Sequence, residues 1–277
     1  MRINNNLTAL NSYRHYNINN SKLSKDVETL SSGFRVNRAA DDAAGLAISE
    51  KMRAQIRGLN MAAKNSQDAV SLVQTAEGGL QTIQDILHRM REMSVQAASE
   101  TNESMDRKAL NEEFQLLKDE ITRITEHTEF NKMTLLNGDF AEKGDKGPLT
   151  IQTGANQGQT MDIAISKMDA ATLKVDDLTI ETQKGATEAI TAITSAVDDV
   201  SLERAKLGAF QNRLEFKIQN LDNQAENVSA AESRIRDADM AKAMISFARN
   251  NILMQASTAM LAQANAIPEN VLSLMEA

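Results

Sequence analysis

The stretch LNMAAKNSQDAVSLVQTAEGGLQTIQDILHRM, residues 59–90, decides the fold of this chain. Small and apolar side chains recur in it at alternating steps of three and four residues. This is the spacing of the a and d positions of a coiled coil, which place one stripe of side chains against a partner helix. We therefore expect a long helix packed lengthwise against others. Its seam positions are Leu59, Ala62, Ser66, Ala69, Val73, Ala76, Leu80, Ile83, Leu87 and Met90.

Two further runs with the same rhythm supply helices to pack against. The first follows the polar turn sequence of residues 98–104. We therefore expect its helix to run antiparallel to the helix that contains residues 59–90. The second follows Gly185 and predicts a helix over residues 186–235, about 75 Å long at about 1.5 Å per residue. Polar Arg204 and Gln211 interrupt this seam, and such residues fix register at some cost in stability. The first run reads Leu110, Phe114, Leu117, Ile121 and Ile124, and the second Ile190, Ile193, Val197, Val200, Leu207, Leu214, Ile218, Leu221, Ala225 and Val228.

The middle of the chain has the pattern of β-strands. Residues 149–153 (LTIQT) and 160–166 (TMDIAIS) alternate apolar and polar side chains, with GANQGQ between them. This arrangement predicts a β-hairpin. Residues 172–182 (TLKVDDLTIET) are a further candidate for a short strand.

The two ends of the chain are amphipathic without a single clean seam. Residues 1–30 and 238–267 place apolar side chains among many Asn, Gln, Ser and Ala residues. One interpretation is a pair of ordinary terminal helices docked on the body of the protein. The other is a pair of helices that are marginal alone and need neighbours in an assembly.

A charged boundary segment lies near each end. SSGFRVNRAADD, residues 31–42, begins where a helix should stop at Gly33, and Asp41 or Asp42 can cap the next helix. Residues 230–244 (AAESRIRDADMAKAM) mix arginine and aspartate in the same way. If the two ends of the chain run alongside each other, the two boundary segments lie next to each other and their charges can pair. The alternative is two solvated charged faces.

Composition excludes several classes of function. Net charge is −8, which disfavours nucleic acid and anionic lipid as general partners. There is no cysteine, so disulfides, thiol catalysis and Cys-based zinc sites are excluded. His15, His88 and His127 lack ligand spacing, and no catalytic motif is present, so we expect neither an enzyme nor a cofactor. No cleavable signal peptide and no apolar run of about 20 residues are visible, so no membrane insertion is expected.

Several long motifs resemble those of bacterial flagellin. They include LSSGFRVNRAADDAAGLAISEKMRAQIRGL, NSQDAVSLVQTAEGGL, TEFNKMTLLNG and IQTGANQGQTM, followed by RAKLGAFQNRLEFKIQNL, NVSAAESRIRDADMAKAM and NNILMQASTAMLAQAN. Together they cover nearly the whole chain at both ends. The resemblance is to a short form, because little sequence is left for the variable outer domains.

The resemblance implies a mainly α fold: an elongated bundle of long coiled-coil-like helices with a small β-hairpin region, and with the N- and C-terminal helices paired. Residues 1–44 would form a channel-lining inner helix and a spoke, 45–140 and 185–236 the helical core domain, 141–184 the hairpin and a remnant of the variable region, and 237–277 the second inner helix. It implies a structural subunit that polymerises into the flagellar filament used for motility. The alternatives are a hook–filament junction protein and a coiled-coil scaffold that forms closed dimers.

The resemblance also implies partners and contact residues. The chain would bind copies of itself, an export chaperone, the filament cap and an innate immune receptor. It would be extracellular, after passing the flagellar export apparatus without a cleaved signal. The receptor candidates are Leu87, Arg89, Glu92 and Glu113, although His88 and Met93 depart from the residues common in the family, as does Lys132 where Gly often stands. The candidates for subunit contacts are Arg35, Arg38, Asp41, Asp42, Arg234, Arg236, Asp237, Asp239, Phe247, Leu253 and Leu261.

Overall fold

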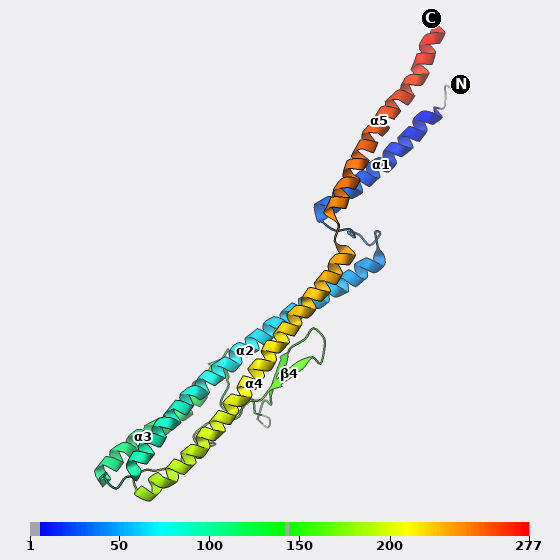
Figure 1. Ribbon diagram of the computed structural model, residues 1–277. Helices are drawn as coiled ribbons and strands as arrows, with labels where there is room; N and C mark the ends of the chain where they lie inside the picture. Colours follow the sequence, from blue (N-terminus) through cyan, green and yellow to red (C-terminus); the bar gives the residue numbers. More distant parts are fainter. Residues whose placement is uncertain (1–5, 142–143, 277) are drawn as a thin grey trace. The chain divides into compact units, whose positions relative to one another are not determined.

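The computed structural model describes residues 6–141 and 144–276, and it divides the chain into two compact units. Unit 1 consists of Met1–Ala54 and Asn227–Ala277, and unit 2 of Gln55–Glu226. The two longest helices, α2 (Ala43–Ala98) and α4 (Gln183–Arg236), contribute residues to both units. The prediction of a mainly α fold built from long helices is confirmed (Figure 1).

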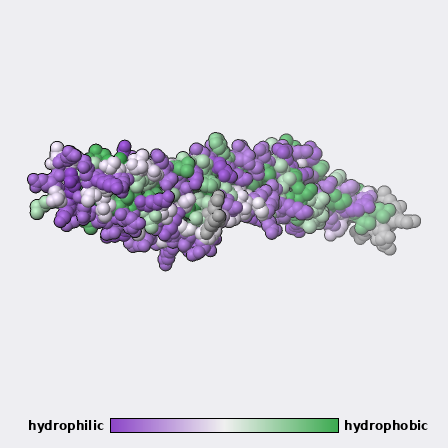
Figure 2. Space-filling view, turned by 90° about the horizontal axis from the view of Figure 1, so that it is seen from below, coloured by the Kyte–Doolittle hydropathy of each residue, from purple (hydrophilic) through white to green (hydrophobic). Residues whose placement is uncertain are grey.

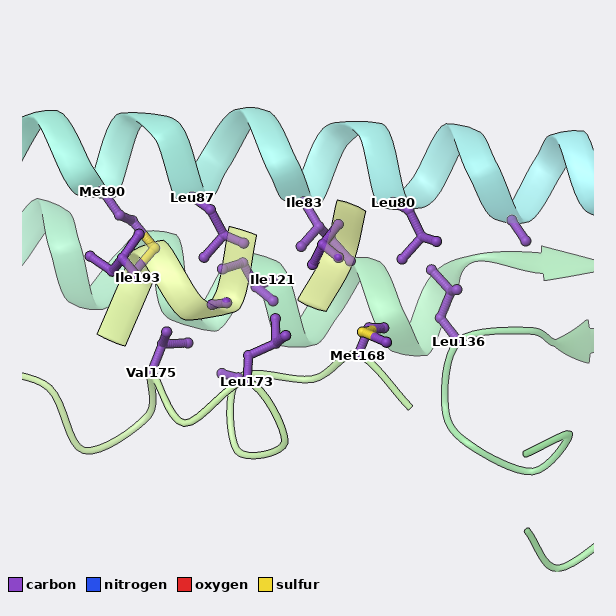
Figure 3. Close-up of a cluster of buried hydrophobic side chains, with 14 of the residues drawn as sticks. Leu80, Ile83, Leu87, Met90, Ile121, Leu136, Met168, Leu173, Val175 and Ile193 are labelled. Atoms are coloured by element: carbon purple, nitrogen blue, oxygen red, sulfur yellow. The ribbon is translucent and has the colours of Figure 1, made fainter. Parts of the chain in front are cut away.

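Unit 2 is built on the predicted seam. In it α2 and α4 lie side by side with α3 (Ser104–His127), which runs back along α2 as the polar turn predicts (Figure 1). All ten seam positions from Leu59 to Met90 are buried. Figure 3 shows Leu80, Ile83, Leu87 and Met90 pointing from α2 into one cluster, where they meet side chains of α3 and α4.

A buried carboxylate interrupts the α4 seam, one residue away from the predicted Arg204. Glu203 is only 2% exposed, and its two oxygens accept from the Ser166 amide at 2.8 Å and the Lys206 ammonium at 3.0 Å. Arg204 is half-buried and binds Glu77 of α2 at 3.2 Å. Polar groups in the seam thus connect α4 both to α2 and to the segment that follows the hairpin.

Two small antiparallel hairpins complete unit 2. The predicted one is present, with β3 (Leu149–Gln152) paired to β4 (Thr160–Ile163). The other joins β1 (Glu129–Phe130) to β2 (Met133–Thr134) and was not predicted. Its turn residues Asn131 and Lys132 have φ values of 50° and 63°. Positive φ at both central residues defines the type I′ turn, which matches the twist of short hairpins.

The strand suggested at residues 172–182 is wrong. This segment forms turns and irregular backbone, although Leu173, Val175 and Ile180 are buried in the core. Side chains of α3 take the place of a partner strand: Asn111 accepts from the Ile180 amide at 3.1 Å, and Lys118 donates to the Leu178 carbonyl at 3.2 Å. Burial of that ammonium group lowers the pKa of Lys118.

Unit 1 pairs the two ends of the chain. Helix α1 (Leu7–Ser32) runs antiparallel to α5 (Met240–Glu276), as Figure 1 shows. Amide side chains connect them along their length: Asn19 donates to Ser257 at 2.9 Å, and Asn250 donates to Asp26 at 2.6 Å. No described residue of α1 is buried. The pair is therefore held together by polar contacts with little apolar core.

We predict that Leu214→Asp unfolds unit 2 at a lower temperature. Leu214 is fully buried in the α4 seam, and an unpaired carboxylate there should cost several kcal/mol. Thermal unfolding followed by circular dichroism measures the change. Asn212→Asp, at an exposed position two residues away, is the matched control and should leave the midpoint within a few degrees. Equal midpoints for the two variants would contradict the packing described.

Lys132→Gly should stabilise the protein by about 0.5–1 kcal/mol. A lysine in the left-handed region strains its backbone by about 1–2 kcal/mol, and glycine relieves this strain while adding some freedom to the unfolded chain. Denaturant unfolding gives the difference. Lys108→Gly, inside α3, should show the opposite sign, a loss of about 1 kcal/mol.

Candidate assembly interface

An unpartnered apolar face on the α1–α5 pair is the first part of the site. Large hydrophobic side chains on both helices keep 43–67% of their surface exposed. Figure 2 shows green, apolar surface among the polar side chains toward the end drawn in grey. Exposed apolar side chains in this number are typical of an interaction surface, and we call the set the apolar face. The residues are Leu7, Leu10, Tyr13, Ile18, Val27, Met240, Met244, Ile245, Ile252, Leu253, Met260 and Ile267.

Two of the predicted contact residues on α5 are less exposed than this face. Phe247 and Leu261 are half-buried, whereas Leu253 is 43% exposed. Leu253 therefore leaves the largest share of its side chain open to a neighbour. All three stay predictions as subunit contacts.

The second part of the site is the junction, which we define as residues 33–42 and 232–239 together with Ser49, Glu50 and Arg53. Gly33 ends α1 in the left-handed conformation, with φ of 75°, as the sequence predicts. The chain then pairs with the segment before α5: Arg35 N donates to Arg236 O at 2.7 Å, and Ala238 N donates to Gly33 O at 2.9 Å. Phe34 and Asp237 form an antiparallel bridge. The two charged boundary segments therefore lie next to each other, as the sequence predicts.

Charged side chains surround the bridge. The carboxylate of Glu232, which is nearly buried, accepts from Ser49 at 2.8 Å and from Arg53 at 3.0 Å. Arg236 donates to Glu50 at 2.6 Å. Two guanidinium groups contact the ring of Phe34, that of Arg236 at 4.8 Å from the ring centre and that of Arg53 at 5.1 Å. Ion pairs and cation–π contacts together fix the start of α2 against the end of α4.

The remaining predicted residues of the first boundary have local roles. Asp41 accepts from Lys25 at 2.7 Å, and this contact holds the pKa of the Asp41 carboxyl below its ordinary value. Arg38 pairs with Glu28 at 2.8 Å. Asp42 caps α2 by accepting from the Gly45 amide at 2.8 Å, which confirms one of the two predicted caps.

At the second boundary, Asp239 caps α5 by accepting from the amides of Ala241 and Lys242. Arg234 is exposed. The sequence predicts the charged residues of this region, but it does not predict the pairing roles of Phe34 and Glu232. The position of Phe34 directly after the helix-ending glycine was the available signal.

The predicted receptor residues lie on unit 2. Arg89 of α2 donates to Glu113 of α3 at 3.0 Å and to Glu92 at 3.5 Å, so these three form an exposed ion cluster. These carboxylates raise the pKa of Arg89. Leu87 is fully buried in the seam, so its side chain is not open to a partner in this structure.

Neither a metal site nor a membrane span is found in the described part of the chain. Residues 6–141 and 144–276 contain no group of three or more His, Asp or Glu side chains that could hold a metal ion. None of the helices in these ranges is long and apolar enough to cross a membrane.

The sequence matches the bacterial flagellin N-terminal helical region over residues 3–141 and the C-terminal helical region over residues 190–275. The chain belongs to the bacterial flagellin family. A flagellin of Halalkalibacterium halodurans is 52% identical over 99% of this chain and 100% of its own length, and one of Bacillus subtilis is 48% identical over 99% and 100%. A flagellar filament 31.3 kDa core protein of Treponema maltophilum is 45% identical over the full length of both chains.

Solved structures agree with this assignment. The crystal structure of Bacillus cereus flagellin is 34% identical, with a TM-score of 0.50 over 61% of this chain and 94% of that one. A putative hook-associated protein of Vibrio parahaemolyticus shares the fold alone, at 12% identity and a TM-score of 0.60 over 71% of this chain and 100% of that one. The protein is thus a structural subunit of the flagellar filament, and not an enzyme.

Glu232→Ala should loosen the junction by about 2 kcal/mol. It removes the acceptor of Ser49 and leaves Arg53 unpaired beside Phe34, and the cost is below the usual 3–5 kcal/mol because Arg53 is one-third exposed. Hydrogen exchange of the amides of α2 between residues 46 and 54 measures the loss. Glu226→Ala, at an exposed position of α4, serves as control. Equal exchange in both variants would show that the cluster does not stabilise the junction.

Proposed function

We propose that copies of this flagellin polymerise through the apolar face of the α1–α5 pair, with the junction holding that pair in a fixed geometry. The exposed apolar side chains of both helices support this proposal, since a soluble protein does not keep such a face without a partner. Contacts between different surfaces of identical copies build an open helical polymer when their rotation does not close into a ring. A filament of this kind serves motility.

The division of the chain in the filament follows from this proposal. Residues 1–44 and 237–277 form the inner, channel-lining layer, with the junction as the spoke between subunits. Residues 45–140 and 185–236 form the helical core domain, and 141–184 the hairpin and the remnant of the variable region. The polar pairing of α1 with α5 and the compact core of unit 2 support assigning different roles to these segments.

Further partners follow from the family resemblance. We propose that an export chaperone and the filament cap bind this chain, and that it passes the flagellar export apparatus without a cleaved signal. An innate immune receptor is a further proposed partner, through Arg89, Glu92 and Glu113 over the buried Leu87. The exposure of the ion cluster supports this contact, while His88 and Met93 depart from the family pattern. The hook–filament junction alternative is not favoured, because the relatives are named flagellins and filament core proteins.

Deleting residues 238–277 should leave unit 2 folded and abolish filament formation. The core of unit 2 does not use this segment, whereas the deletion removes α5 and with it half of the apolar face. Circular dichroism of the truncated protein checks the fold, and sedimentation and electron microscopy under polymerising conditions check assembly. Ordinary long filaments from the truncated protein would defeat the proposal. An unfolded product would show instead that α5 belongs to the main bundle.

A further inference from the structure

The apolar face of the α1–α5 pair carries exposed sulfur on one of its two helices. Three of its twelve residues are methionines, and all three lie on α5: Met240, Met244 and Met260. They leave 45%, 56% and 53% of their surface exposed, whereas α1 contains no methionine. The other members of the face have hydrocarbon or phenol side chains, which peroxides do not oxidise readily. The thioethers are therefore the groups through which an oxidant can change this face.

The methionines of unit 2 differ from those of α5 in where an oxidant can reach them. Met90 and Met93 are fully buried in the core, and Met168 is only 6% exposed. Two methionines of this unit are exposed, Met61 on α2 by 56% and Met105 at the start of α3 by 79%. An oxidant that reacts first with exposed sulfur leaves the packed core unchanged. Its early products divide between the apolar face and these two positions outside it.

Oxidation replaces an apolar group of the face by a polar one. The thioether sulfur attacks one oxygen of hydrogen peroxide, so that an S–O bond forms while the O–O bond breaks. The departing hydroxide takes the proton left on the transferred oxygen and leaves as water. The sulfur is oxidised to the sulfoxide and the peroxide is reduced. The sulfoxide oxygen accepts hydrogen bonds, and burying it against apolar side chains without a donor is unfavourable.

We propose that Met240, Met244 and Met260 form a redox-sensitive modification site, at which hydrogen peroxide converts the free subunit into a form that polymerises poorly. This inference rests on the proposed polymerisation through the apolar face. In the free subunit the sulfoxides meet water, so the fold of the chain is unchanged. In the polymer they meet the apolar side chains of another copy, and the contact is weakened. The same cover shields the sulfur atoms of subunits that are already assembled, so the site acts on free chains.

The test compares leucine variants of the full-length chain after treatment of the free subunits with hydrogen peroxide. The test variant combines Met240→Leu, Met244→Leu and Met260→Leu, which keep an apolar side chain of similar volume but cannot be oxidised. The matched control combines Met61→Leu with Met105→Leu, at equally exposed positions outside the apolar face. Mass spectrometry of peptides locates the sulfoxides, and thermal unfolding checks the fold.

Treatment should raise the critical concentration for seeded polymerisation at least about tenfold in the parent and the control, but less than about twofold in the test variant. Methionine sulfoxide reductases should restore polymerisation of the treated parent, because they return the sulfoxides to thioethers. Filaments treated in the same way should be oxidised at α5 more slowly than free subunits. Sedimentation after seeding measures the critical concentration of each sample.

The outcomes separate this proposal from the proposed polymerisation. If the untreated parent does not polymerise, the proposed function fails. If the parent polymerises normally with all three residues oxidised, the modification site is overturned while the polymerisation stands. Equal losses in the test variant and the parent would assign the effect to other residues and also overturn the site. A lower unfolding temperature of the treated parent would do the same, because it would show damage to the fold.

Discussion

The packing of one side-chain stripe at steps of three and four residues is the constraint on which this protein depends. Aromatic residues make up only 3% of the chain, so no thick globular core can form, and Leu, Ile, Val, Ala and Met must fill narrow seams instead. Helices become long because each turn adds one more seam contact. The hairpins and the irregular segment that contains Val175 then cover the open side of this core.

The same rhythm explains how much of the fold can be predicted from the sequence. A helical seam repeats over many residues, so one atypical residue does not change the prediction. All ten predicted positions of the α2 seam are buried. Local capping rules act on single residues and also held, at Gly33 and Asp42. Segment 172–182 has apolar alternation but no partner strand. Its backbone groups bond to Asn111, Gln115 and Lys118, which lie 60 to 69 residues away in sequence, and no local pattern reveals such contacts.

The site was predictable in outline only. Charge clusters near the two ends indicated that the boundaries meet, and the bridge between Phe34 and Asp237 confirms this pairing. The partners of individual charges were not predictable. Glu232 and Arg53 lie on helices whose rotation decides which side chain meets which, and this rotation depends on packing along both helices. The roles of these residues as subunit contacts remain predictions, since a single chain does not contain the neighbour.

The polar pairing of α1 with α5 has a kinetic consequence for the proposed polymerisation. A helix pair with hardly any buried apolar surface gains little free energy when it forms alone, so its ordering is nearly neutral until other copies cover it. Starting a new filament requires several chains to order their ends at once, whereas an existing tip offers a finished template to each arriving chain. If assembly uses these helices as proposed, we expect slow spontaneous nucleation and fast elongation. The weakness of the terminal contacts would then confine growth to the end of a filament that already exists.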